Sequence, residues 1–170
     1  MGAYKEIRDT FIREYKEKPV EYKNRIVKWR SEPPIERIDK PTNIPRARKL
    51  GYKAKEGIIM ARVKVKGGGK KRATVGGGRK PSKSGRYFTR AKSLQSIAEE
   101  RASKKFSNCE VLNSYFVGKA GSDSFYEIIM LERDNAAIQN DLTYSNVIGK
   151  KGRAFRALTK SGRKHRGLMA

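Results

Sequence analysis

The side chains of this sequence that could do chemistry are mostly cationic. Forty-one lysines and arginines accompany 17 acidic residues, giving a formal net charge of +24 over 170 residues. Residues 46–92 hold 17 of these cations and one acid, and residues 149–170 hold eight cations and no acid. Such segments bind polyanions, because they neutralise phosphates and release the counterions that surround them. The sequence therefore predicts a nucleic-acid-binding protein whose working state is a complex.

Groups that could support catalysis or hold a metal are scarce. With a single cysteine, Cys109, and a single histidine, His165, the chain can form neither an internal disulfide nor a zinc site. Cys109 is expected to fill apolar space at the start of a strand, and His165 to contact phosphate or base. Glu99 and Glu100 are expected to pair with basic residues one helical turn away. We therefore predict no enzymatic activity, no cofactor, no metal and no small-molecule substrate.

Two glycine motifs are similar to known phosphate-binding loops. The run at 67–70 lacks the flanking glycine and hydroxyl residue of a P-loop, since Lys64 and Lys71 stand at those positions. Residues 149–152, Gly-Lys-Lys-Gly, match the GXXG loop of KH modules. A KH loop joins two helices, however, and residues 141–146 show no apolar helical face. A free-standing KH-like regulatory RNA-binding module is therefore the alternative function.

The first 45 residues are nearly balanced in charge, and their pattern predicts helices. Apolar residues recur at intervals of three and four from Tyr4 to Tyr15, and again from Tyr22 to Trp29. Pro19 suits the first turn of the second helix, and Pro33 and Pro34 stop it. Apolar runs are no longer than four residues, so we expect neither a signal peptide nor a membrane span.

Residues 46–92 are expected to present cations from several kinds of structure. Thr42 or Asn43 can cap a short helix that ends before Gly51 and displays its basic residues on a rigid turn. Alternation over 58–66 predicts a strand whose outer face is purely cationic. Residues 66–86 contain seven glycines and eight lysines or arginines. Burial of apolar side chains within this stretch therefore cannot offset the conformational entropy that the stretch would lose on ordering. Tyr87 and Phe88 could stack on bases or begin the next core element.

Residues 93–148 hold most of the candidate core. A helix capped by Ser93 is followed by two β-rich runs, 111–117 and 125–131, separated by a glycine-containing turn. Asp134 is expected to cap a further short helix. The predicted fold class is α+β, a small antiparallel sheet packed with helices, with long basic glycine-rich extensions. We expect a single domain over 1–170, with a helical part at 1–45, a basic turn, strand and glycine-rich arm at 46–92, and a helix and hairpin core at 93–148. Residues 149–170 are expected to form a basic extension that reaches outward.

The basic residues of the turn, the strand, the glycine-rich stretch and the C-terminal segment are the candidate RNA contacts. They are Arg46, Arg48, Lys49, Lys53, Lys55, Arg62, Lys64, Lys66, Lys70, Lys71, Arg72, Arg79, Lys80, Lys83, Arg86, Lys150, Lys151, Arg153, Arg156, Lys160, Arg163, Lys164, His165 and Arg166.

Longer strings carry a family resemblance. In order along the chain, the residues at 1–5, 47–57, 91–102, 111–118 and 158–168 resemble a large-subunit ribosomal protein of archaea and eukaryotes, the e-type family fifteen. The resemblance implies an α+β core whose basic extensions penetrate ribosomal RNA, with a stabilising role and without catalysis. It implies large-subunit ribosomal RNA and neighbouring ribosomal proteins as partners, no membrane, and a location in the cytoplasmic ribosome. Family members usually carry a basic tail beyond the Gly-Leu pair, whereas this sequence stops at Ala170; its length suggests an archaeal member.

Overall fold

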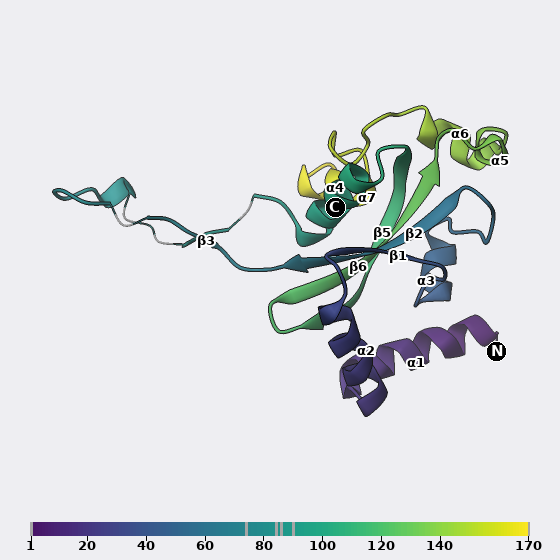
Figure 1. Ribbon diagram of the computed structural model, residues 1–170, viewed down its shortest axis with the longest axis horizontal. Coiled ribbons are helices and arrows are strands. Elements are labelled where there is room, and N and C mark those ends of the chain that lie inside the picture. The colour runs from purple at the N-terminus through teal and green to yellow at the C-terminus, as the bar shows by residue number, and fades with distance from the viewer. Residues whose placement is uncertain (1, 74, 84, 86, 90, 170) are drawn as a thin grey trace.

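A four-stranded antiparallel sheet forms the centre of the protein in the computed structural model, which describes residues 2–73, 75–83, 85, 87–89 and 91–169 (Figure 1). The strand order is β1-β2-β6-β5, with bounds β1 (Ile35–Ile38), β2 (Ile58–Lys66), β5 (Cys109–Ala120) and β6 (Asp123–Glu132). Seven α-helices accompany the sheet in the described residues, so the α+β prediction is confirmed. None of the helices there is long and apolar enough to cross a membrane.

The N-terminal helices follow the predicted apolar spacing. Helix α1 (Ala3–Glu17) is followed by α2 (Val20–Ser31), which begins directly after Pro19 and ends before Pro33. Strand β1 was not predicted, because prolines flank its four residues. Helix α3 (Ile44–Lys49) begins at Asn43, whose side chain accepts a hydrogen bond from the Arg46 backbone N–H at 3.0 Å. The predicted cap and short helix are therefore confirmed.

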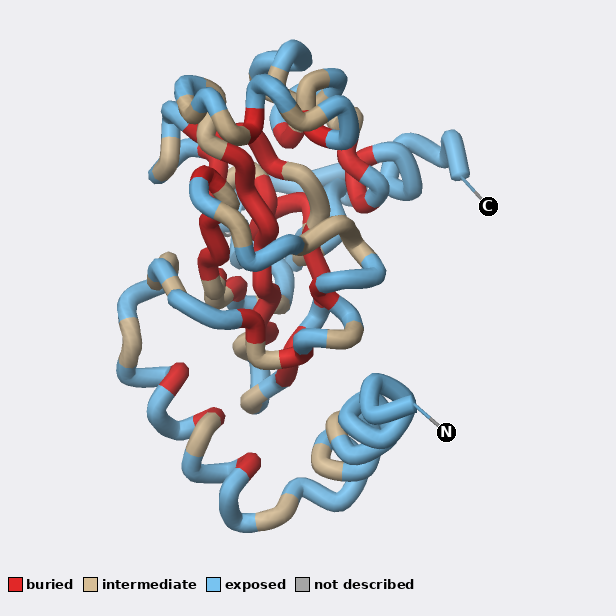
Figure 2. The backbone as a smooth tube through the Cα atoms, turned by 90° about the vertical axis from the view of Figure 1, so that its right-hand side faces the viewer, coloured by how far each residue is buried: buried red, intermediate tan, exposed pale blue. Residues whose placement is uncertain are grey.

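The two faces of the sheet are covered by different helices. Helix α4 (Leu94–Lys105) packs Ile97 and its alanines against the β2 face that carries Val63 and Val65. Helix α2 packs Trp29 and its neighbours against the opposite face, where Phe125 lies. Figure 2 shows the buried residues concentrated in the sheet and α4, while α1 contains no buried residue. Amphipathic elements thus cover both sides of the central strands.

The hairpin and the helices after it differ in detail from the predictions. Strands β5 and β6 pair directly across a short turn and are longer than the two predicted runs, with register shifts near positions 112 and 117 of β5. Helix α5 (Ala136–Gln139) is capped by Asn135 and not by Asp134. Residues 142–148 form helix α6 (Leu142–Ile148), although no helix was expected there. Its buried Tyr144 packs beside Leu131 and Ile138, so tertiary burial replaces the missing apolar stripe.

The glycine-rich stretch leaves the sheet beyond β2. Two short strands, β3 (Lys70–Lys71) and β4 (Tyr87–Phe88), pair with each other in a separate ribbon. A 3-10 turn at Pro81–Lys83 lies farther out, and Figure 1 shows this part of the chain running away from the body.

Gly118 gives a direct test of the packing between α2 and the sheet. A Cβ atom at this position would lie 2.9 Å from Ile26 Cδ1 and 3.0 Å from Tyr22 Oη. We expect Gly118→Val to lower the free energy of unfolding by about 1–3 kcal/mol, because the added methyl groups overpack this contact. Gly149→Ala is the control, since its nearest neighbour would lie 3.6 Å away, and its stability should be unchanged or raised by up to about 1 kcal/mol. Urea unfolding measures both, and equal stability of the two variants would contradict the packing described.

Candidate nucleic-acid interface

Helix α3 presents an exposed basic turn. Its inner side is anchored by Ala47, which is fully buried, while Arg46, Arg48 and Lys49 are exposed. The Arg48 guanidinium lies 5.2 Å from the centre of the Tyr4 ring and so joins α3 to α1. The predicted rigid turn therefore exists, with one of its three cations in contact with an aromatic ring.

A buried carboxylate holds the start of this turn. Glu127 of β6 is completely buried and accepts hydrogen bonds from the Thr42 backbone N–H at 3.0 Å, the Thr42 hydroxyl and the Tyr115 hydroxyl. Burial raises the pKa of Glu127 and also that of Tyr115. The chain before α3 is therefore attached to the centre of the sheet across 85 residues of sequence.

The residues that follow α3 are tied to α6. Lys53 and Lys55 reach Asp141 Oδ2 at 3.4 and 3.2 Å, and the Tyr144 hydroxyl donates to the Gly51 carbonyl at 2.7 Å. Hydrogen bonds from Thr143, followed by those from the two lysines, hold the pKa of Asp141 well below its usual range. Asp141 therefore partly neutralises both predicted phosphate contacts.

The cationic outer face predicted for β2 is wrong. Arg62 Nη2 lies 2.9 Å from Glu32 Oε2, and its guanidinium lies 4.5 Å from the centre of the Trp29 ring. Lys64 Nζ donates to the carbonyl oxygens of Arg30 at 2.6 Å and of Glu32 at 2.9 Å, at the end of α2. Helix α2 covers this face, so both cations have protein partners. Only Lys66, at the end of the strand, is exposed as predicted.

The separate ribbon carries a dense group of exposed cations. All of those described there are exposed, namely Lys70, Lys71, Arg72, Arg79, Lys80 and Lys83; Arg86 lies outside the described residues. Tyr87 is 67% exposed, and Phe88, 37% exposed, has the Arg72 guanidinium 3.6 Å from its ring centre. Neither aromatic residue is part of the hydrophobic core. Of the two predicted roles, stacking on bases is therefore the one that their exposure favours.

The Gly149–Gly152 loop is closed by a second buried carboxylate. Glu110 of β5 accepts from the Gly152 backbone N–H at 2.9 Å and from the Arg153 backbone N–H at 3.3 Å. Arg153 turns inward and donates to the Val111 carbonyl at 3.0 Å. A KH clamp needs free backbone donors for the nucleic acid, whereas Glu110 already uses these two. The geometry therefore argues against the KH-like alternative and removes Arg153 from the accessible cations.

A third buried carboxylate attaches the C-terminal segment. Glu99 of α4 accepts hydrogen bonds from the Ser114 hydroxyl and, at 2.6 Å, from the Thr159 hydroxyl. Thr159 caps helix α7 (Lys160–His165), whose Ser161 lies 2.9 Å from the Ser96 hydroxyl. Residues 159–162 therefore pack on α4, and the expectation that this whole segment reaches outward is wrong.

The pairing predicted for the two acids of α4 is also wrong. Glu99 contacts hydroxyl groups, as described above, and Glu100 pairs with Lys92, eight residues earlier, at 2.6 Å. Cys109, in contrast, is buried as predicted, and burial raises the pKa of its thiol to about 11, which suits inert filling of apolar space.

Exposed basic side chains remain around the docked C-terminal segment. They are Lys150, Lys151, Arg156, Lys160, Arg163, Lys164, His165 and Arg166. Together with α3 and the ribbon they form three basic surfaces, and buried acids hold the chain at two of them, α3 and the C-terminal segment. This role of Glu99, Glu110 and Glu127 was not predicted; their position inside apolar strand and helix patterns was the available signal.

The raised pKa of Glu99 predicts how stability depends on pH. Burial is the main cause, so the folded state binds this proton at a higher pH than the unfolded chain does. The stability from this group is full below its unfolded pKa and is lost as pH rises through the folded pKa. We expect Glu99→Gln, which keeps hydrogen-bonding atoms but cannot ionise, to flatten the fall in unfolding free energy between pH 5 and pH 8.

Urea unfolding at both pH values measures this effect. Glu99→Ala is the comparison, because it leaves two buried hydroxyl groups without their acceptor and should cost about 1–3 kcal/mol at either pH. Equal destabilisation by the two substitutions at pH 8 would contradict the account, since the ionised carboxylate itself would then be required.

Comparison with known proteins identifies the family of this chain. Residues 2–170 match the family described as Ribosomal L15. The chain is 45% identical over 171 residues to the large ribosomal subunit protein eL15 of Metallosphaera sedula, an alignment that covers 99% of this chain and 79% of that protein. This is a family of structural ribosomal proteins, which agrees with the prediction that the chain is not an enzyme. Both comparisons span nearly the whole chain, and the protein therefore belongs to the Ribosomal L15 family.

Proposed function

We propose that this protein is a structural component of the large ribosomal subunit, in the cytoplasmic ribosome, where it binds and stabilises ribosomal RNA through its basic surfaces. Family membership supports the assembly. The observation that carries the mode of binding is the separation of charge. Glu99, Glu110 and Glu127 are buried, whereas the cations of the three basic surfaces have no carboxylate partner among the residues that the structure describes. Neighbouring large-subunit ribosomal proteins are the other expected partners.

The three surfaces suit different parts of an RNA fold. The α3 surface is short and rigid, as expected for contact with one stretch of backbone. It consists of Arg46, Arg48 and Lys49. The C-terminal surface is held against α4 by the Glu99–Thr159 hydrogen bond, which positions its cations before RNA arrives. Both surfaces can therefore bind phosphates with little loss of conformational freedom.

The ribbon suits a different mode of RNA binding. Its cations belong to a narrow two-stranded segment that runs away from the sheet (Figure 1), and its glycines allow the backbone to come close to sugar and phosphate. We propose that this segment is a basic extension that enters the RNA, where charge neutralisation and counterion release stabilise its ordered form. Arg86 belongs to this extension by its place in the sequence.

The cations with protein partners have a smaller role in this proposal. Arg62, Lys64 and Arg153 contribute to folding, while Lys53 and Lys55 share the charge of Asp141. Phosphate binding by the remaining exposed cations is expected to follow the shape of the RNA more than its sequence, because backbone contacts carry no base information.

The salt dependence of binding tests the proposal. If the full-length chain neutralises about ten phosphates, log affinity for large-subunit ribosomal RNA should fall with log salt at a slope of roughly −7 to −9. Replacing Arg46 and Lys49 by Gln should make that slope shallower by roughly 1.4–1.8, since two contacts are lost. The control replaces Lys23 and Lys28 by Gln on exposed positions of α2 and should leave the slope unchanged. A parent slope near −2, or equal effects of the two double variants, would contradict the proposal.

A further inference from the structure

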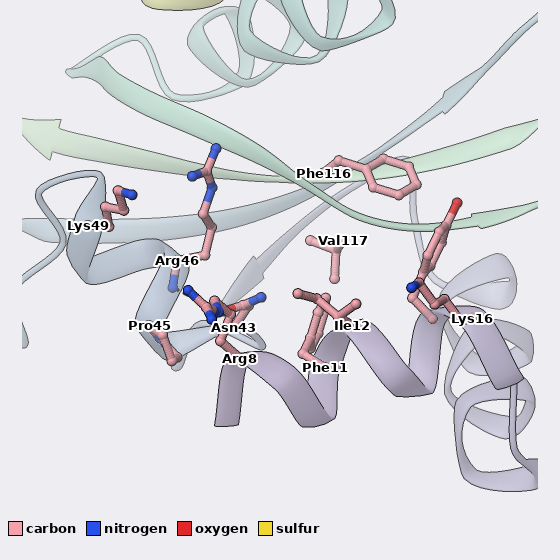
Figure 3. Close-up of a pocket in the computed structure, with 11 residues that line it drawn as sticks. Arg8, Phe11, Ile12, Lys16, Asn43, Pro45, Arg46, Lys49, Phe116 and Val117 are labelled. Atoms are coloured by element: carbon pink, nitrogen blue, oxygen red, sulfur yellow. Dashed lines mark hydrogen bonds between the residues drawn. The ribbon is translucent and has the colours of Figure 1, made fainter. Parts of the chain in front are cut away.

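A pocket of about 410 Å³ lies between α1, α3 and β5. Phe11, Ile12 and Tyr15 of α1 face Phe116 and Val117 of β5 across it, and Figure 3 shows the labelled members of this set turned toward the space between the two elements. The lining is mainly apolar, yet the pocket opens to the surface. We call it the α1 pocket.

The apolar side chains of the α1 pocket are partly exposed to solvent, although their aromatic rings contact one another. Ile12 is 46% exposed, Tyr15 37% and Phe116 39%. Tyr15 and Phe116 meet edge to face with ring centres 5.6 Å apart, and Phe116 meets Tyr126 at 5.7 Å. The apolar face predicted for α1 therefore forms one aromatic side of the pocket. The described part of the chain does not cover it.

The rim of the α1 pocket carries only one sign of charge. Arg8, Lys16, Arg46 and Lys49 line it, and none of the lining residues is acidic. Helix α1 as a whole has four basic and four acidic residues, and of these only Arg8 and Lys16 line the pocket. Asp9 contacts Arg8, whereas Lys16, Arg46 and Lys49 have no carboxylate partner within the residues that the structure describes.

The cations lie at both ends of the apolar wall. Arg8, Arg46 and Lys49 gather at the α3 end, and Lys16 lies at the far end near Phe116 (Figure 3). The helical rise places Arg8 and Lys16 about 12 Å apart along α1. An occupant must therefore combine flat apolar groups in its middle with negative charge on either side.

We infer that the α1 pocket receives unstacked nucleotides of an RNA strand, whose bases lie against Phe11, Tyr15 and Phe116 and whose phosphates meet the basic rim. The inference rests on the proposed function and extends it from phosphate binding to base contact. Unpaired bases stack on aromatic side chains whatever their identity, and flanking cations hold the backbone. Arg46 and Lys49 belong to both the α1 pocket and the α3 surface, so a strand bound at α3 continues directly into the pocket. An acidic segment of another ribosomal protein would lack this continuity.

Photocrosslinking of large ribosomal subunits that contain the full-length chain tests the inference. After ultraviolet irradiation and digestion, mass spectrometry should find nucleotide adducts on peptides that carry Phe11 and Tyr15 or Phe116. Adducts on the 67–92 ribbon with none at the α1 pocket would overturn the inference and leave the proposed function standing. Amine-reactive crosslinks from Lys16 or Lys49 to another ribosomal protein, without nucleotide adducts there, would assign the pocket to a protein partner. Absence of adducts from the whole chain would count against the proposed function as well.

A matched pair of variants separates base contact from general attraction. With the isolated full-length chain and oligouridylate as probe, the yield of adducts at Phe116 is divided by the yield at Tyr87 and Phe88. Ile12→Asn should lower this ratio roughly 5- to 150-fold, the range that corresponds to about 1–3 kcal/mol of lost apolar contact between a nucleotide and the pocket wall. Val27→Asn, at a position of α2 that is 66% exposed, should leave it unchanged. Equal ratios for Ile12→Asn and the parent would overturn the inference.

Discussion

Three buried carboxylates connect the basic segments of this chain to its sheet. Glu127 holds Thr42 ahead of α3, Glu110 holds the backbone at Gly152, and Glu99 holds Thr159 at the start of α7. An isolated charge inside a protein costs several kcal/mol unless donors surround it, and in each case two or more donors do so. The donors that belong to the basic segments come from 42 to 85 residues away in the sequence. The basic segments at α3 and around α7 are thus attached to the core by its buried carboxyl groups.

This arrangement explains how a chain of net charge +24 supports a defined fold. The acids of the core face inward, so the outward cations at α3 and around α7 are not neutralised by the protein and remain available to phosphate. The described residues of the ribbon beyond β2 have no such anchor; the two strands contact each other and lie outside the main sheet. The protein therefore combines preformed basic surfaces with one projecting segment, and the α1 pocket adds an apolar site beside the first of these surfaces.

Local spacing predicted most of the elements but not the partners of their charges. Intervals of three and four residues identified α1 and α2, and the Asn43 cap with Pro45 identified α3, because these signals depend on residues close in sequence. Alternation identified β2 but led to the wrong environment for Arg62, since it assumes solvent on the far face, where α2 packs Trp29. Helix α6 was missed because its stability comes from burying Tyr144 and not from a repeated apolar stripe. The hydrogen bonds of Glu99 and Glu110 join distant segments, which no spacing rule can detect.

The most direct test of this account compares lysine reactivity in the free chain with reactivity in large ribosomal subunits, read by acylation and mass spectrometry. Association with RNA through the basic surfaces predicts that Lys49, Lys71 and Lys160, all exposed in the protein alone, lose most of their reactivity in the subunit. Lys23 and Lys28 on α2 should keep theirs. Equal reactivity of Lys49, Lys71 and Lys160 in both states, with protection of the α2 lysines instead, would contradict the account.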